Sequence, residues 1–190
     1  PVKQRHIARI AGIAGIALTL AAAALPLASP LAAQTGEALI RKAGAAPGIA
    51  SPTFAAPRNL EYRVAWDITE GPAKPEDAVA GYNVPANFFV MTDAEGVSRK
   101  QVHLAIIVHG TATQSLLTNE AYKAATGKDN ANVALLTALN DAGVQVIVCG
   151  VALVNRKVPR DKLLPFVRVS TSATMARAVL HAQGYATFSQ

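Results

Sequence analysis

Hydrophobic residues in the second half of the chain gather into short runs that alternate with stretches of helical spacing. The runs at 102–109 and 144–149 are almost entirely apolar, which is the pattern of strands buried on both faces of a sheet. Between them, residues 132–143 carry apolar side chains at helical spacing and end at Gly143, which predicts an amphipathic helix. This alternation of strand and helix predicts a parallel sheet.

The remaining elements follow the same alternation. Strands are expected at 62–68, 167–170 and 185–188, and helices at 160–166 and 171–184. The segment 75–96 contains NFFVMT, which also suits a strand, but Pro85 in a first turn and Gly96 as a terminator favour a helix.

Five strands separated by helices predict an α/β fold, a five-stranded parallel doubly wound sheet of the flavodoxin-like type with helices on both faces. The expected strand order is 2-1-3-4-5, and ligands bind beyond the carboxyl ends of such strands, where the order reverses. The third strand ends at Cys149. This order would place Cys149 at the switch point beside Asp67 and Thr69, with His109 one strand further away.

The first 33 residues have the pattern of a secretory signal. Three basic residues precede an apolar, charge-free stretch at 10–27, and small residues follow, so cleavage is expected after Ala33. An uncleaved membrane anchor is the alternative, because the stretch is near the lower length limit for a spanning helix. The content of Ala and Gly and the helix-breaking Pro26 favour cleavage. In both cases the folded part is exported, and a periplasmic location is expected.

The rest of the chain divides into two parts. Residues 34–60 are rich in Ala, Pro and Gly and lack sustained periodicity, so we expect a linker or an arm along the surface. Residues 61–190 are expected to form one folded domain, because a chain of 190 residues is too short for two ordinary domains.

Charge and motif content exclude several classes of function. Without the three basic residues before Gln34, the chain has 15 basic and 12 acidic residues, a net charge of +3 in place of +6. No stripe of Lys and Arg is interleaved with aromatic residues, so nucleic acid is not an expected partner. The histidines and the cysteine lack metal-ligand spacing, and GxGxxG, phosphate-loop and GxSxG motifs are absent, so neither a metal nor a cofactor is expected.

Cys149 is the only cysteine, so it cannot form a disulfide within one chain. Gly150 leaves space beside the sulfur, and a following helix or a nearby imidazole would favour a reactive thiolate. Free cysteine is also among the most buried residue types, and an inert packing role fits equally well.

Two further segments carry candidate chemistry. His109, followed by Gly110 and Thr111, suits either a general base or a structural latch. Residues 170–172 suit the N-cap of a helix, and their backbone amides also suit a small anion.

Three stretches form a set: HLAIIVHG at 103–110, KDNANVALLTALNDAGVQVIVCG at 128–150, and VRVSTSATMARAVLHAQGYATF at 167–188. As a set they resemble the DsrE/DsrF-like sulfur-relay family, in particular its exported single-domain members. The resemblance covers about residues 62–188. It implies a five-stranded doubly wound fold, homo-oligomers of three subunits or a multiple of three, and a cysteine that carries sulfur as a persulfide.

By position, the resemblance makes Cys149 the sulfur carrier and His109 its catalytic companion. It also singles out Asn87, in the helix before the HG segment, and Asn130 in DNAN. The full set of expected ligand-binding residues is Asn87, Gly110, Thr111, Asn130, Gly150, Ser170 and Ser172.

We therefore expect an exported protein that binds or relays sulfane sulfur through Cys149, as a sulfurtransferase-like carrier. Its expected partners are further copies of the chain and a sulfur donor or acceptor, which is a protein or a small thiol. Contact with a membrane is expected only if the signal is uncleaved. The alternative is a non-catalytic oligomeric module that binds a small ligand or a partner, with Cys149 as buried packing.

Overall fold

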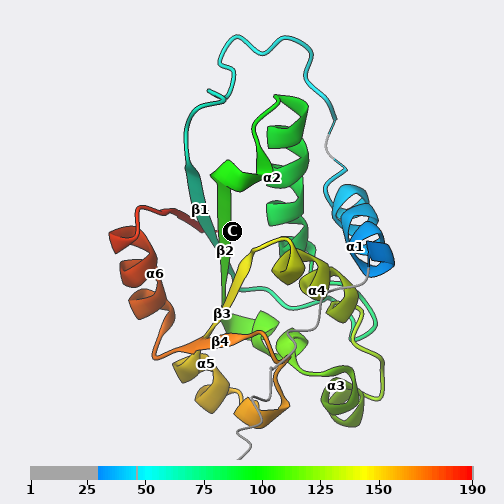
Figure 1. Ribbon diagram of the computed structural model, residues 1–190. Coiled ribbons are helices and arrows are strands. Elements are labelled where there is room, and N and C mark those ends of the chain that lie inside the picture. Colours follow the sequence, from blue (N-terminus) through cyan, green and yellow to red (C-terminus); the bar gives the residue numbers. More distant parts are fainter. Residues whose placement is uncertain (1–29, 46, 190) are drawn as a thin grey trace, which may run out of the picture.

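The computed structural model describes residues 30–45 and 47–189 (Figure 1). The α-helices are α1 (Pro30–Ala43), α2 (Asn83–Ala94), α3 (Asn119–Thr126), α4 (Val133–Asp141), α5 (Gly150–Asn155) and α6 (Ala173–Ala182). The strands are β1 (Tyr62–Ile68), β2 (Val102–Val108), β3 (Gln145–Cys149), β4 (Arg168–Ser170) and β5 (Ala186–Ser189). Short 3-10 helices are η1 (Ala80–Tyr82), η2 (Arg99–Gln101), η3 (Gly110–Leu116) and η4 (Arg160–Lys162).

The five strands form one parallel sheet in the order β4-β3-β2-β1-β5. The predicted fold class is therefore confirmed, but the predicted order, which put β1 between β2 and β3, is wrong. The chain steps in one direction from β1 to β4 and then crosses back to place β5 beside β1. Both orders arise from the same alternation of strand and helix, and the direction of each step is set by packing between distant segments.

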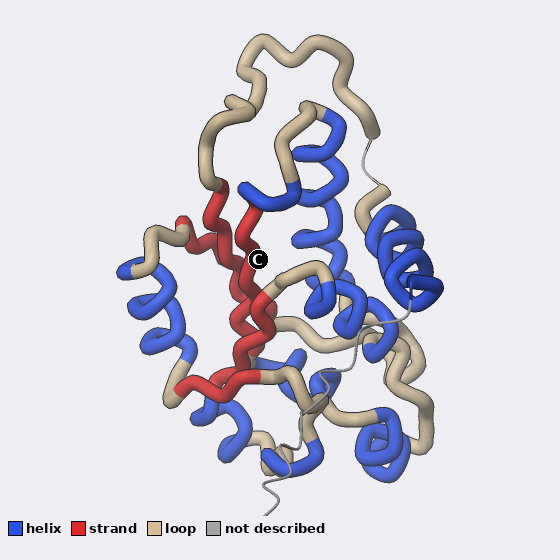
Figure 2. The backbone as a smooth tube through the Cα atoms, in the orientation of Figure 1, coloured by secondary structure: helices blue, strands red, loops and turns tan. Residues whose placement is uncertain are grey.

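Two unequal layers of helices cover the sheet (Figures 1 and 2). Helices α2 and α4 lie on one face with α1 packed against both, whereas α6 lies on the other face. Alternate strand residues point to each face: Trp66 and Val108 join the larger core under α2 and α4, while Ala65 and Ile107 pack against α6. In the described part of the chain, the sheet is therefore thickly covered on one side and covered mainly by α6 on the other.

Helix α1 includes the first part of residues 34–60, the segment that was expected to form a linker or an arm along the surface. Ile40 is buried and belongs to the core under α2 and α4. A Cβ on Gly44, just after this helix, would clash with the backbone of Ala86, so the chain passes close against α2 there. The helix ends before the proline-rich part of the segment. Because the segment as a whole is rich in Ala, Pro and Gly, the short apolar face of the helix was not recognised from composition. Residues 44–61 contain no helix or strand among the described positions.

The predicted secretory signal falls mostly outside the described residues, because residues 1–29 are not among them. Its expected cleavage site after Ala33 lies within α1. Within the described ranges, no helix is both long and apolar enough to cross a membrane.

Candidate functional site

Near the carboxyl edge of the sheet, β1 to β4 each end in a polar side chain or a thiol on the face toward α6. These residues are Asp67, His109, Cys149 and Ser170. Val108 of β2 pairs with Val148 of β3, so His109 and Cys149 are aligned on neighbouring strands. Cys149 pairs in turn with Ser170 of β4. Because β2 lies between β1 and β3, His109 is beside Cys149 and Asp67 is on the far side of His109. This corrects the expectation that Asp67 neighbours Cys149 and that His109 is one strand further away.

Cys149 is buried, with 6% of its surface exposed, and it ends β3 where α5 begins. Its Sγ accepts a hydrogen bond from the backbone N–H of Ala152 at 3.4 Å, so the thiol caps the first turn of α5. A Cβ on Gly150 would lie 2.8 Å from the carbonyl oxygen of Ser170. The glycine is therefore needed for the close approach of this junction to β4.

A second group of polar side chains, the aspartate cluster, consists of Asp67, His109 and Arg177. Asp67 is 4% exposed, and its Oδ2 accepts a hydrogen bond from Nε of Arg177 on α6 at 2.8 Å. Its Oδ1 lies 3.4 Å from Nε2 of His109, and both of these buried atoms lack a hydrogen-bond partner among the described residues. Sequence reasoning did not identify the importance of Asp67 and Arg177. The available signal was a carboxylate inside the apolar strand YRVAWDI, because a buried charge requires a partner.

Asn130 belongs to a different group, the asparagine cluster, which consists of Ser115, Asn130, Asn132 and Tyr82. Nδ2 of Asn130 donates to the backbone oxygens of Ser115 at 2.9 Å and Leu117 at 2.8 Å. Its Oδ1 accepts hydrogen bonds from the backbone and side-chain nitrogens of Asn132. The amide of Asn130 is therefore fully used in holding loops together.

Three of the other expected ligand residues also have structural contacts. Oγ1 of Thr111 accepts a hydrogen bond from Gly71 and donates one to Thr69, so it fastens two loops. Oγ of Ser172 accepts a hydrogen bond from the N–H of Met175 and caps α6. Oγ of Ser170 donates to the backbone oxygen of Ser172.

Asn87 is not brought to this edge with the other residues. It lies on α2, whose buried side chains Ala86 and Phe89 pack into the core on the opposite face of the sheet from Cys149. Gly110 does lie beside His109, and its φ is +60°. A Cβ on Gly110 would lie 2.5 Å from the carbonyl oxygen of Thr69, so both the backbone conformation and the lack of space explain the glycine there.

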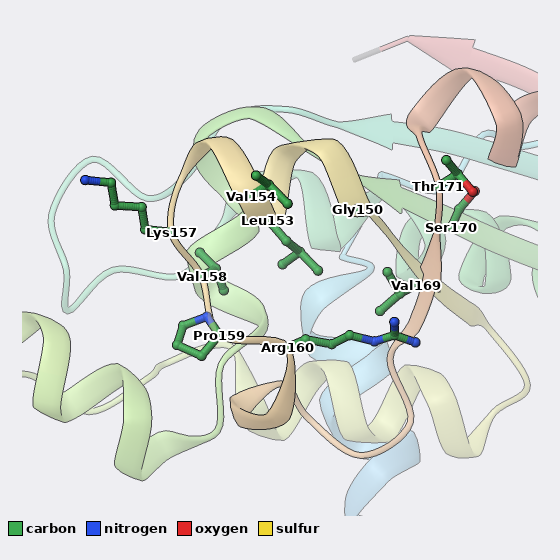
Figure 3. Close-up of a pocket in the computed structure, with 10 residues that line it drawn as sticks. All are labelled: Gly150, Leu153, Val154, Lys157, Val158, Pro159, Arg160, Val169, Ser170 and Thr171. Carbon is green, nitrogen blue, oxygen red and sulfur yellow. The ribbon is translucent and has the colours of Figure 1, made fainter.

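A cavity of about 510 Å³ opens next to the β3–α5 junction and extends from Gly150 to Arg160 (Figure 3). Apolar side chains of α5 and β4 line it, and Cys149 is not among its lining residues. Figure 3 shows Arg160 reaching toward Val169, while Lys157 points away from the cavity. Neither cation forms an ion pair with a described residue. The cavity therefore has the cation of Arg160 at its rim and lies beside the thiol without including it.

Metal-ligating side chains are scattered through the described part of the chain. No group of three or more His, Cys, Asp or Glu side chains is placed there to hold a metal ion. The groups brought together at this edge are a thiol, an imidazole and a carboxylate paired with a guanidinium.

Comparisons with known proteins agree with this fold. The model of the DsrE/DsrF-like family matches residues 63–189. Among solved structures, a protein of unknown function, MTH1491 from Methanobacterium thermoautotrophicum, aligns with a TM-score of 0.50 and 21% identity, over 68% of this chain and 99% of that one. At this level of identity the likeness shows the fold alone. A search of the curated proteins finds no match.

Proposed function

Because the chain belongs to the DsrE/DsrF-like family, we propose that it binds or relays sulfane sulfur through Cys149. Membership of the family suggests a sulfur-relay-like role. The observation that carries the specific proposal is the position of the thiol. Sγ of Cys149 ends β3, accepts a hydrogen bond from Ala152, and lies beside the aligned His109 on the same face of the sheet.

The proposed chemistry is an exchange of sulfur between thiolates. The Cys149 thiolate attacks the outer sulfur of a persulfide or polysulfide donor; a sulfur–sulfur bond forms on Cys149 while the donor's sulfur–sulfur bond breaks, and the donor leaves as a thiolate. An acceptor thiolate then attacks the outer sulfur of the Cys149 persulfide and releases the Cys149 thiolate. A hydrogen bond from the N–H of Ala152 stabilises the anionic sulfur in each step.

Intact-mass spectrometry tests this proposal after the folded protein is incubated with inorganic polysulfide. The wild type is expected to gain the mass of one sulfur atom and to lose it to added thiol, whereas Cys149→Ser gains none. His109→Gln is expected to load more slowly. His103→Gln is the matched control, because His103 lies on β2, the strand that His109 follows, and its hydrogen bond to a described residue is with the exposed Glu61. Equal loading of the wild type and Cys149→Ser would exclude the proposal.

A second candidate function is a binding module for a small anion, with Cys149 as packing. The specific observation in its favour is the cavity beside Gly150, which excludes the buried thiol and has Arg160 at its rim. Calorimetric titration with thiosulfate separates the two functions. The module predicts binding that survives Cys149→Ser and is lost in Arg160→Gln. Sulfur transfer predicts a covalent product that depends on Cys149.

We propose that the protein forms homo-oligomers through α6, with a second copy of the chain as the partner. Met175 and Val179 are one turn apart on this helix and are about half exposed, at 52% and 49%. When a second copy of the chain covers this pair, its apolar surface is removed from water. Light scattering is expected to give a multiple of the chain mass, and Val179→Lys is expected to lower it. A monomeric wild type would reject this part of the proposal.

We also propose that the folded part is exported to the periplasm. The support is the order of basic, apolar and small residues in positions 1–33. Fractionation of expressing cells, with N-terminal sequencing of the recovered protein, is expected to find the chain in the periplasmic fraction with a start near residue 34. Recovery of the full chain from the cytoplasm would contradict it.

A further inference from the structure

The aspartate cluster contains two buried polar atoms that face each other without a proper hydrogen bond. Oδ1 of Asp67 and Nε2 of His109 lie 3.4 Å apart, and neither has another partner among the described residues. An unpaired buried acceptor or donor is costly, and more so when one of the groups is charged. A small rotation of the imidazole satisfies both atoms at once, provided that Nε2 carries the hydrogen and donates it to Oδ1.

Arg177 determines which oxygen of Asp67 is available. Its Nε donates to Oδ2 at 2.8 Å from α6, and this contact leaves Oδ1 toward His109. A carboxylate accepts hydrogen bonds and cannot donate one. Only the tautomer of His109 with the hydrogen on Nε2 therefore suits this arrangement.

We propose that Asp67, held by Arg177, is a positioning residue that keeps His109 in its Nε2–H tautomer and leaves Nδ1 to accept the proton of the Cys149 thiol. This inference rests on the proposed function of Cys149 as the reacting group. Nδ1 of His109 has no hydrogen bond among the described residues, and the register places His109 directly beside Cys149 on the face toward α6.

The proposed step is a single proton transfer. The S–H bond of Cys149 breaks, an N–H bond forms at Nδ1 of His109, and the electron pair stays on sulfur as the thiolate. The imidazolium that results is stabilised by the Asp67 carboxylate, which remains ionised throughout. This is the orienting role that a third group plays for a nucleophile and its base. His109 touches the reacting thiol in this scheme, whereas Asp67 and Arg177 act through His109.

The competing explanation is that the Asp67–Arg177 pair only fastens α6 to the sheet. Asp67→Asn distinguishes the two, because it keeps the size of the side chain and its contact with Arg177. The oxygen of the new amide accepts from Arg177, so its NH2 group faces His109 and requires Nε2 to be the acceptor. The tautomer of His109 is therefore expected to switch to Nδ1–H. The positioning role predicts that this switch also slows formation of the Cys149 thiolate, which a fastening role does not.

The test combines two measurements on the folded full chain. Nitrogen-15 NMR of the imidazoles reports the tautomer, and the rate of reaction with iodoacetamide reports how readily Cys149 becomes a thiolate. Asp67→Asn is expected to switch the tautomer of His109 and to slow alkylation by about 10-fold or more, as the loss of a general base does. Asp161→Asn is the matched control, because Asp161 is an exposed carboxylate away from this face.

Arg177→Gln provides a second variant that leaves Asp67 in place. It is expected to give a mixture of tautomers and an intermediate alkylation rate, because the carboxylate loses its anchor. An unchanged tautomer in Asp67→Asn, or a switched tautomer with wild-type alkylation, would overturn the inference. Failure of the proposed function is a separate result: a thiol that alkylates in the wild type but never accepts sulfur from polysulfide.

Discussion

The asparagine cluster and the aspartate cluster are both buried polar groups in the same small domain, but they differ in how completely their hydrogen bonds are made. Every polar atom of the Asn130 side chain has a partner, and Asn132 in turn accepts from the N–H of Val79. Within the described ranges, Asp67 and His109 each retain a buried atom without a hydrogen-bond partner. The satisfied cluster fixes loops, whereas the two facing atoms of the aspartate cluster are those through which we propose that Asp67 orients His109.

This difference changes the roles that the sequence pattern suggested. Asn130 was expected to bind a ligand, yet its amide has no capacity left for one without breaking the loop contacts. Asp67 carries no motif, yet it lies next to the histidine that neighbours the thiol. The roles that we propose therefore rest on the hydrogen bonds of these residues and not on their place in a motif.

The largest expected effect comes from breaking the asparagine cluster at Asn130. Asn130→Ala leaves the backbone oxygens of Ser115 and Leu117 without donors in a buried site. The free energy of unfolding is expected to fall by about 3 kcal/mol, measured by urea denaturation. Asn140→Ala is the control, because the one hydrogen bond of that amide to a described residue is with its neighbour Asp141, and it is expected to cost less than about 0.5 kcal/mol. A similar small cost at Asn130 would show that the cluster is not structural.

The next effect tests the glycine that follows His109. Gly110 begins η3, which carries Ser115 of the asparagine cluster, so it joins the two clusters along the chain. Gly110→Ala introduces a positive-φ alanine and a Cβ against the backbone of Thr69. We expect a loss of about 2 kcal/mol in the free energy of unfolding, measured as above. Gly127→Ala is the control, because it shares the positive φ but has open space around it, and it is expected to cost about 1 kcal/mol.

Tyr82→Phe removes one hydroxyl from the asparagine cluster and is expected to cost about 1 kcal/mol at neutral pH. Burial raises the pKa of Tyr82 well above its ordinary value of 10.0, although its hydrogen bond with Ser115 opposes the shift. The unfolded chain therefore loses this proton first as pH rises above about 10, and the folded state loses stability there. Urea denaturation between pH 9 and 11 should show a smaller loss of unfolding free energy with pH for Tyr82→Phe than for the wild type. Equal losses would contradict burial as the cause of the raised pKa.

The smallest expected change in stability is at the aspartate cluster itself. Asp67→Asn keeps an acceptor for Arg177 and removes a carboxylate oxygen that already lacks a hydrogen bond. The free energy of unfolding is expected to change by less than about 1 kcal/mol, while the alkylation rate of Cys149 falls. A loss as large as that of Asn130→Ala would remove the distinction between the two clusters.

Much of the fold follows from local sequence patterns. The apolar runs place β1, β2 and β3 within one or two residues, and the glycine stops place the ends of α4 and α6. The helix chosen over a strand in 75–96 is α2. The expected helix at 160–166 forms only as the short η4, because Pro165 disfavours helical continuation just beyond it.

The remaining features depend on contacts between distant segments. The strand order depends on how whole strand–helix units pack together. Helix α1 is held in place by α2 and α4, which lie far from it in the sequence. Helix α5 is only six residues long, too short to give a periodic pattern, so the capping role of Cys149 was not predicted. The pairing of Asp67 with Arg177 joins β1 to α6 across 110 positions. Its detection requires the fold.

The central claim is that Cys149 is a reacting group and not core packing, and its 6% exposure makes access the decisive question. The most direct test measures the rate of iodoacetamide reaction with the folded wild-type protein over a series of low urea concentrations. Access in the native state predicts a rate that is nearly independent of urea until the protein unfolds. The contrary result is a rate that rises from the lowest urea concentrations, in step with the fall in the free energy of unfolding. It would mean that the thiol reacts only in unfolded chains, and it would contradict the account.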